Sequence, residues 1–219
     1  MRFNTSFWER NIFFALLLCI VFTFAITPFL QEEETASRLL NVFLVLMLVF
    51  SVIIVGDTKI SFFVALLLGA PMLISNATAF LYTKEGFPVL VAFSSALFFI
   101  YVIVMLLKKI FTSRVIDINI ILGAVCVYFL ISVVWALLHG LVEAYVPGSY
   151  DVAGEQMSSV DMNVFMYYSI VTLTTLGYGD ITPLSASARS LAAMEALVGQ
   201  IYLTVIIARL VGLHMQQKT

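Results

Sequence analysis

The residues with the clearest bearing on chemistry lie between Asp161 and Pro183, in the sequence D-M-N-V-F-M-Y-Y-S-I-V-T-L-T-T-L-G-Y-G-D-I-T-P. An apolar stretch at about 161–174 comes first and is too short to cross a bilayer. Gly177 and Gly179 follow, with one residue between them. Because glycine adopts positive φ without a steric penalty, alternate glycines let successive carbonyl groups turn to one side. Carbonyl oxygens gathered in this way can replace the water shell of a cation without burying a charged side chain.

The composition indicates that this segment belongs to an integral membrane protein. Of the 219 residues, 62% are hydrophobic and 11% are charged, whereas a soluble domain has roughly 45–50% apolar and about 25% charged residues. A surface with so few charges must be covered by lipid. The formal net charge of −2 gives no indication of nucleic acid binding. Cys19 and Cys126 lie in long apolar runs, which favours core residues over a disulfide or a metal site.

Hydropathy predicts an all-α membrane protein with six transmembrane helices. A spanning helix needs about 20 apolar residues, and such stretches lie at about 11–30, 38–56, 60–82, 87–107, 117–145 and 189–213. The first is longer than the apolar part of a typical signal peptide and lacks an A-x-A-like cleavage site, so we expect it to remain as a span. The stretch at 161–174 then forms a re-entrant helix between the fifth and sixth spans.

The segment after the re-entrant helix implies a pore. Non-helical backbone at membrane depth is allowed only where protein buries it or where it lines a water-filled path. We therefore divide the chain into a four-helix peripheral membrane domain at 1–112, a pore domain at 113–214 and a short cytoplasmic tail at 215–219.

The basic residues predict the orientation in the membrane, because cytoplasmic loops are enriched in lysine and arginine. With six spans, both termini share a side that holds seven of these residues, against three on the other side. We expect a multi-pass protein of the cell membrane with both termini in the cytoplasm. The seven residues are Arg2, Arg10, Lys59, Lys108, Lys109, Arg114 and Lys218, and the three are Arg38, Lys84 and Arg189.

Residues 174–180, T-T-L-G-Y-G-D, resemble the signature of potassium channels. A simple tight turn between helices is the alternative, but this combination of residues arises by chance roughly once per million positions at average composition. The order of the last two spans and the re-entrant helix also resembles the pore domain of the six-transmembrane, voltage-gated-like family. That similarity covers about residues 117–213, and over residues 1–110 it is one of topology alone.

The resemblance implies a homotetramer with a selectivity filter made of backbone carbonyls. The partners of the chain are then three further copies of itself, membrane lipids and potassium ions, with no nucleic acid, and the bound ion is K+. Leu176 stands where valine is commoner in the family. The filter residues that would bind the ion are Thr175, Leu176, Gly177, Tyr178 and Gly179, with K+ placed at the first four.

Three residues are expected to support the filter on the pattern of this family. Tyr167 and Tyr168 occupy the positions of its bracing aromatic residues, and Tyr167 is expected to hydrogen-bond to Asp180. Tyr168 is expected to pack near Tyr178. A role in the core alone is the alternative for both bracing tyrosines.

The sixth span carries an apolar stripe that we expect to line the cavity below the filter and to form a gate. Its members recur every four residues, although an ordinary helix-packing stripe has the same spacing. Gly199 matches the hinge glycine of the family by its distance from the filter. The stripe consists of Gly199, Leu203, Ile207 and Val211. Arg209 is off this face, and we expect it to extend to the inner lipid headgroups.

Three other ionisable residues lie inside predicted spans. Glu195 is a candidate for a modulatory role, either by hydrogen bonding behind the short helix or by sensing protons, and a neutral structural carboxyl is the alternative. His139 and Glu143 lie four residues apart in the fifth span. We expect them to anchor the outer loop, with Arg189 a candidate partner, rather than to bind a metal.

The fourth span does not have the pattern of a voltage sensor, which needs an arginine at every third position. No arginine or lysine lies between Phe87 and Leu107. We therefore expect passive conduction of K+ with weak voltage dependence. The alternatives are a less selective cation channel and a non-conducting accessory subunit. No catalytic constellation is present in the sequence, so an enzyme is not expected.

Overall fold

The computed structural model describes residues 13–22, 42, 44–53, 63–71, 73–74, 89–113, 115–157 and 160–217. Within these ranges, helical segments occupy Phe13–Phe22, Leu44–Ile53 and residues 63–71. The remaining elements are α4 (Val89–Thr112), α5 (Ile118–Tyr145), β1 (Tyr150–Val152), β2 (Glu155–Gln156), α6 (Met162–Leu173), β3 (Ile181–Pro183) and α7 (Ala186–Gln217).

Three of the described helices, α4, α5 and α7, are long and apolar enough to cross a membrane. They match the spans predicted at 87–107, 117–145 and 189–213. Large parts of the spans predicted at 11–30, 38–56 and 60–82 lie outside the described residues, as do most of the basic residues used to orient the chain. The count of six spans and the cytoplasmic termini therefore stay predictions.

Local sequence signals fix where these helices begin. Asp117 precedes α5, and its side chain accepts a hydrogen bond from the backbone N–H of Ile120 at 2.9 Å. Asp161 does the same for α6 by accepting from the N–H of Asn163 at 2.8 Å. Ser185 accepts from the N–H of Ala188 at 3.2 Å, so α7 begins three residues before the predicted span.

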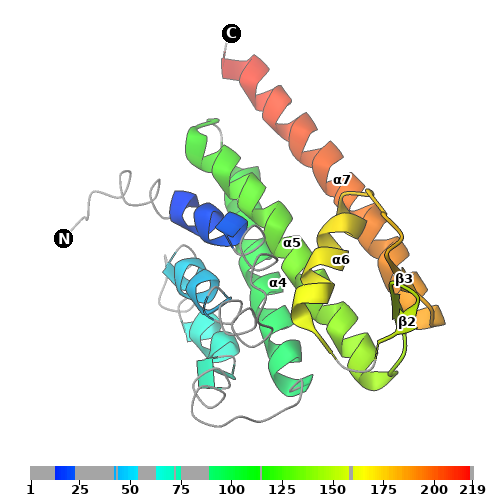
Figure 1. Cartoon of the computed structure of the whole chain (residues 1–219). Coiled ribbons are helices and arrows are strands. Elements are labelled where there is room, and N and C mark those ends of the chain that lie inside the picture. Colours follow the sequence, from blue (N-terminus) through cyan, green and yellow to red (C-terminus); the bar gives the residue numbers. More distant parts are fainter. Residues whose placement is uncertain are drawn as a thin grey trace.

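The short helix α6 lies between α5 and α7 (Figure 1). Its 12 residues, about 18 Å of helix, are too few to cross a bilayer. The short apolar helix predicted at 161–174 is thus confirmed. Its Phe165 and Leu173 are fully buried, which fixes the depth of α6 against the longer helices.

A small antiparallel sheet accompanies the helices of the all-α fold that the sequence predicts. Its strand order is β2-β1-β3, with Val152 opposite Glu155 and Tyr150 opposite Pro183. The β1–β2 hairpin turns at Ala153 and Gly154, whose φ angles are 53° and 93°. Two positive φ angles in a two-residue loop are typical of the type I′ hairpin turn. Hydropathy missed the sheet because its strands are only two or three residues long.

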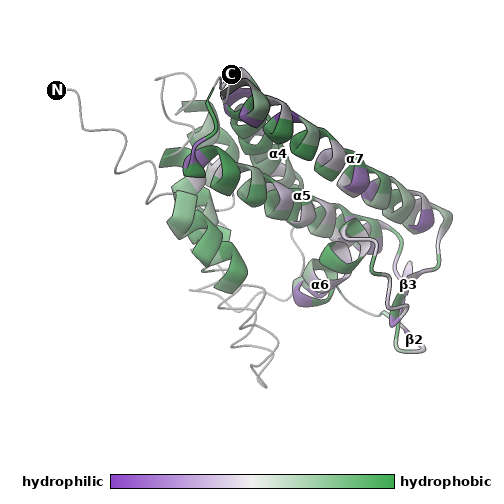
Figure 2. Cartoon of the chain, turned by 90° about the horizontal axis from the view of Figure 1, so that it is seen from above, coloured by the Kyte–Doolittle hydropathy of each residue, from purple (hydrophilic) through white to green (hydrophobic). Residues whose placement is uncertain are grey.

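The core is apolar and lies mainly along α4 and α5, whereas α7 keeps a large exposed apolar surface. Figure 2 shows hydrophobic residues over most of α4 and α5, with hydrophilic residues at the start of α6 and along α7. In α7, Ile201, Ile207 and Val211 are 60%, 58% and 57% exposed. A membrane helix in this state is covered by lipid or by further protein chains.

Candidate ion-conducting site

The segment after α6 has positive φ at every second residue. The φ angles are 59° at Thr175, 58° at Gly177 and 81° at Gly179. The positive φ angles predicted for the two glycines are therefore confirmed. Such alternation turns the peptide planes so that carbonyl groups that would point in opposite directions in an ordinary strand can point to one side.

Backbone hydrogen bonds show where the start of this segment points. The N–H of Thr175 donates to the carbonyl of Thr172 at 2.9 Å, and the N–H groups of Leu176 and Gly177 donate to that of Val171 at 2.9 and 3.4 Å. Within a planar trans peptide, the N–H and the preceding C=O point in opposite directions. Because three successive N–H groups face the end of α6, the carbonyls of residues 174–176 face away from it.

The positive φ of Thr175 was not predicted from the sequence. A β-branched residue at positive φ is an outlier, and such strain persists only where the surrounding structure holds it. Here the bond from its N–H to Thr172 and a 3.4 Å contact from Gln200 Nε2 to its Oγ1 hold it in place. The alternation therefore begins at Thr175, two residues before the first of the glycines.

Asp180 anchors the far end of the segment. The hydroxyl of Tyr167 donates to Asp180 Oδ2 at 2.7 Å, which confirms the predicted bond. The N–H of Ile181 donates to Oδ1 at 3.1 Å, and the carbonyl of Asp180 accepts from the N–H of Ala153 at 2.8 Å. The extended segment is thus held at one end by α6 and at the other by the β1–β2 hairpin.

Tyr168 lies in a cluster of aromatic rings on the buried side of α6. Its ring centroid is 4.9 Å from that of His139 and 5.6 Å from that of Tyr150, both edge-on. Tyr178 is 67% exposed in the single chain. The predicted packing of Tyr168 near Tyr178 stays a prediction.

The residues from Thr174 to Asp180 are all exposed in the single chain, including the large side chains of Leu176 and Tyr178. Exposed apolar groups beside a fixed backbone mark a surface for contact with protein, membrane or a ligand. The carbonyl face of the segment is therefore open for contact with an ion or with other chains.

Gly199 lies against the end of α6, which differs from its expected place in the apolar stripe. A Cβ on Gly199 would overlap the carbonyl oxygen of Leu173, so only glycine allows α7 to approach this closely. A step of four residues advances about 40° beyond a full helical turn. The stripe therefore rotates from the buried Gly199 through the half-buried Leu203 to the exposed Ile207 and Val211.

The structure adds two polar residues to the exposed face of α7 that sequence reasoning missed. Gln200 contacts Thr175, as described above, and the hydroxyl of Thr204 donates to the carbonyl of Gln200 at 2.8 Å. Ile207 and Val211 lie on the same helical face, seven and eleven residues after Gln200. The spacing i, i+4, i+7, i+11 would have identified this face.

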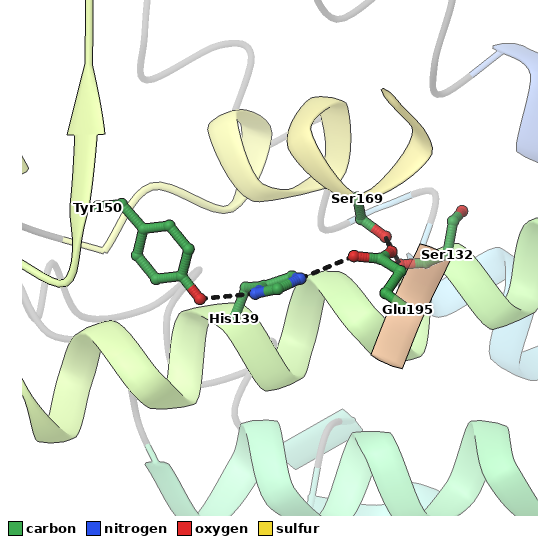
Figure 3. Close-up of polar contacts among 5 residues, drawn as sticks. All are labelled: Ser132, His139, Tyr150, Ser169 and Glu195. Atoms are coloured by element: carbon green, nitrogen blue, oxygen red, sulfur yellow. Dashed lines mark hydrogen bonds and ion pairs between the residues drawn. The ribbon is translucent and has the colours of Figure 1, made fainter. Parts of the chain in front are cut away.

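Glu195 is fully buried at the junction of α5, α6 and α7. It contacts Ser169 of α6 and His139 of α5 (Figure 3), so it hydrogen-bonds behind the short helix, which was one of the two roles considered for it. A modulatory role stays a prediction. Neither partner was identified from sequence, although polar residues inside apolar spans were the available signal.

His139 and Glu143, which were predicted to act together, contact different groups. Glu143 accepts from the N–H groups of Gly148 and Ser149 at 2.7 and 2.9 Å, so it anchors the loop that follows α5, as predicted. His139 instead faces Tyr150 and Glu195. Arg189 donates to the carbonyl of Pro183 at 3.2 Å, so its suggested contact with this pair is not the one formed.

The place of Arg209 also differs from expectation. Its Nη2 donates to the carbonyls of Phe111 and Ser113, each at 2.9 Å, where α4 ends. The last carbonyls of a helix lack partners within it, and the guanidinium supplies one. Arg209 therefore links α7 to α4 rather than extending freely to lipid headgroups.

In the part of the chain that the structure describes, no three His, Cys, Asp or Glu side chains are placed to hold a metal ion. The groups available to bind a cation at this site are the carbonyl oxygens of the extended segment and the Thr175 hydroxyl.

Comparison with known proteins agrees with this geometry. Residues 118–215, from the start of α5 almost to the end of α7, match the family described as "Ion channel". Residues 118–215 are therefore similar to an ion channel family, and the three long apolar helices indicate a membrane protein.

A curated relative gives a more distant match. The chain is 33% identical over 67 residues to "Two-pore potassium channel 4" of Arabidopsis thaliana, which covers 29% of this chain and 24% of the relative. The chain thus matches about a quarter of that protein's length. No solved structure matches the chain.

Proposed function

We propose that this chain is one subunit of a tetrameric, potassium-selective channel that conducts K+ passively. Its filter is the segment from Thr175 to Gly179. The observation that carries the proposal is the alternation of positive φ along this segment together with N–H groups turned back to α6. Four such segments around an axis would offer rings of carbonyl oxygens to a dehydrated ion.

The position of α6 supports the same function. The last carbonyls of a helix carry partial negative charge, and α6 ends at Leu173, directly before the extended segment. In a tetramer, four helix ends would face the inner mouth of the filter and stabilise a cation there. Gln200 and Thr204 would line the cavity at this depth, and Ile207 and Val211 would narrow it further along α7.

The peripheral helices are not expected to sense voltage in the usual way. In α4 the first 19 residues contain no basic side chain, and Lys108 and Lys109 follow near its end. Moving charge through the membrane field is what makes opening steeply voltage-dependent. We propose weak voltage dependence for this channel.

Potassium flux into liposomes that contain the purified protein tests the proposal. We expect flux that barium blocks and that Gly177→Ala removes. Flux in the purified wild type excludes the alternative of a non-conducting accessory subunit. Equal flux of sodium and potassium would support the less selective cation channel instead and would contradict the proposal.

A further inference from the structure

Four fully buried polar side chains from four different elements form one hydrogen-bonded chain behind the filter (Figure 3). Tyr150 comes from β1, His139 from α5, Glu195 from α7 and Ser169 from α6. The chain ends at the carbonyl of Ser132 in α5. None of these contacts belongs to the filter itself, and sequence reasoning identified only two of the side chains.

The contacts are short and continuous. Tyr150 Oη lies 2.6 Å from His139 Nδ1, and His139 Nε2 lies 2.8 Å from Glu195 Oε2. On the other side of the carboxyl group, Oε1 lies 2.5 Å from Ser169 Oγ. Ser169 Oγ in turn lies 2.7 Å from the carbonyl oxygen of Ser132. Each of the four contacts needs one proton.

The Ser132 end of the chain fixes the protonation of Glu195. A backbone carbonyl can only accept, so the hydroxyl proton of Ser169 lies between Ser169 and Ser132. Ser169 then has no second proton for Glu195. The 2.5 Å contact between these two residues therefore requires a proton on Glu195, which makes Glu195 a neutral carboxylic acid that donates to Ser169.

Starting from Tyr150, the hydrogen bonds run in a direction that agrees with a neutral Glu195. Burial raises the pKa of the Tyr150 hydroxyl, so Tyr150 keeps its proton. Its described contact is His139 Nδ1, to which it donates. A neutral His139 then carries its proton on Nε2 and donates to Glu195 Oε2.

A charged pair of His139 and Glu195 satisfies these contacts less well. A proton on His139 Nδ1 would leave the Tyr150 hydroxyl without an acceptor among the described residues. An ionised Glu195 and the Ser132 carbonyl would also compete for the one proton of Ser169. Two buried charges would in addition lose their hydration, whereas a neutral chain avoids that loss.

The hydrogen-bonded chain of side chains fixes α6 to α7 next to the filter. Ser169 precedes Leu173 by one helical turn, and Glu195 precedes Gly199 by one turn. Leu173 and Gly199 form the close backbone contact described above. The two helices are thus joined at two successive turns, directly before Thr175. A change in either contact would shift the start of the filter.

We propose that the neutral chain Tyr150–His139–Glu195–Ser169 holds α6 against α7 and thereby keeps the filter in its ion-binding conformation. Glu195 acts as a positioning residue, and it does so as a protonated acid. This inference rests on the proposed channel function, since its effect on conduction is measured through the filter.

Two substitutions at one position test the inference in the full protein in liposomes. In Glu195→Gln, the new side chain would present the same pattern as a neutral acid, since its carbonyl accepts from His139 and its amide donates to Ser169. We expect this variant to keep potassium flux within about twofold of the wild type, because no buried group loses its partner. Glu195→Leu leaves the buried His139 Nε2–H without its acceptor and removes the bond between α7 and Ser169 of α6, and we expect flux to fall by about tenfold or more.

The protonation state has a readout that does not depend on conduction or on assembly of the leucine variant. In the infrared spectrum of the wild-type protein at neutral pH, we expect the carbonyl band of a protonated carboxylic acid, and Glu195→Gln should remove it. Absence of this band from the wild type, or a tenfold loss of flux in Glu195→Gln, overturns the inference. A wild type that shows the band but passes no potassium contradicts the proposed function instead.

Discussion

The two ends of the proposed pore domain are held together by different numbers of directional bonds. Near the proposed filter, α5, α6, α7 and the small sheet are joined by several directional bonds, including the buried ones of Glu195 and the exposed one of Asp180. At the far end, α7 is attached through Tyr202, whose hydroxyl donates to the Ala124 carbonyl at 2.6 Å, and through Arg209. An apolar groove of about 490 Å³ lies among α4, α5 and α7.

This difference indicates which end moves. Directional bonds between buried groups fix a structure, because each group left without a partner costs about 1–3 kcal/mol. The far end of α7 has fewer described bonds of this kind, those of Tyr202 and Arg209, and its apolar contacts can slide without losing one. We therefore expect the filter end to keep its geometry during gating and the far end of α7 to change position.

The largest effect is expected from the backbone of the filter. In Gly177→Ala, a side chain at positive φ costs about 1–2 kcal/mol, or about 4–8 kcal/mol over four subunits, so flux should fall by about a hundredfold or more. Potassium flux into liposomes measures this. Gly212→Ala is the matched control, since its Cβ meets nothing within 4 Å. A conducting Gly177→Ala variant would show that positive φ is dispensable.

The contact between α6 and α7 should give the next largest effect. In Gly199→Ala, the new Cβ meets the carbonyl of Leu173, and overpacking of this kind costs about 1–3 kcal/mol per subunit. We expect a lower thermal unfolding temperature of the purified protein, together with reduced flux. Gly212→Ala should leave the unfolding temperature unchanged or higher. An unchanged temperature in Gly199→Ala would mean that α7 is free to bend away at this point.

The outer anchor of the filter can be measured as a coupling energy. Tyr167→Phe removes the donor to Asp180, and a hydrogen bond to a charged group contributes about 1.5–3 kcal/mol when protected from water. Because Tyr167 is 38% exposed, we expect a coupling of about 1 kcal/mol. A double-mutant cycle with Asp180→Ala gives this value. The quantity measured for each variant is how long potassium flux persists. Additive effects would show that the bond does not hold the filter.

At the far end, Arg209→Gln should alter opening more than selectivity. The substitution removes two hydrogen bonds of about 0.5–1.5 kcal/mol each between α7 and the end of α4. We expect the open probability of single channels to change severalfold while the reversal potential stays constant. Lys108→Gln, a nearby loss of positive charge, is the control. A changed reversal potential would mean that the two ends are not independent.

The smallest effect is expected from the basic residues at the end of α4. Lys108→Gln combined with Lys109→Gln should leave the slope of the conductance–voltage curve almost unchanged, because neither residue lies in the apolar part of the helix. Voltage-clamp recordings measure the slope. A shallower curve in the double variant would identify these lysines as gating charges.

Sequence alone predicted the parts of this molecule that depend on local backbone chemistry. Spans of the right length, a short helix and glycines at alternate positions follow from hydropathy and from the freedom of glycine at φ. Asp180 and Tyr167 were also paired correctly, on the pattern of a known family. The spans before residue 87 lie largely outside the described residues and stay predictions.

Other features depend on how distant segments meet, which a single sequence does not encode locally. The partners of Glu195 come from helices 26 and 56 residues away. Gly199 was assigned by its distance from the filter, whereas the contact with Leu173 depends on the rotation of α7 against α6. The positive φ of Thr175 results from bonds to Thr172 and Gln200 rather than from any preference of threonine.

A reversal potential measured across a planar bilayer tests the central claim most directly. Purified protein would be placed between a potassium solution on one side and a sodium solution on the other. From the proposed function we expect a current that reverses close to the equilibrium potential of potassium, whatever voltage protocol precedes the measurement. A reversal potential near zero would show that the carbonyl oxygens of Thr175 to Gly179 do not distinguish the two ions, and would contradict the proposed function.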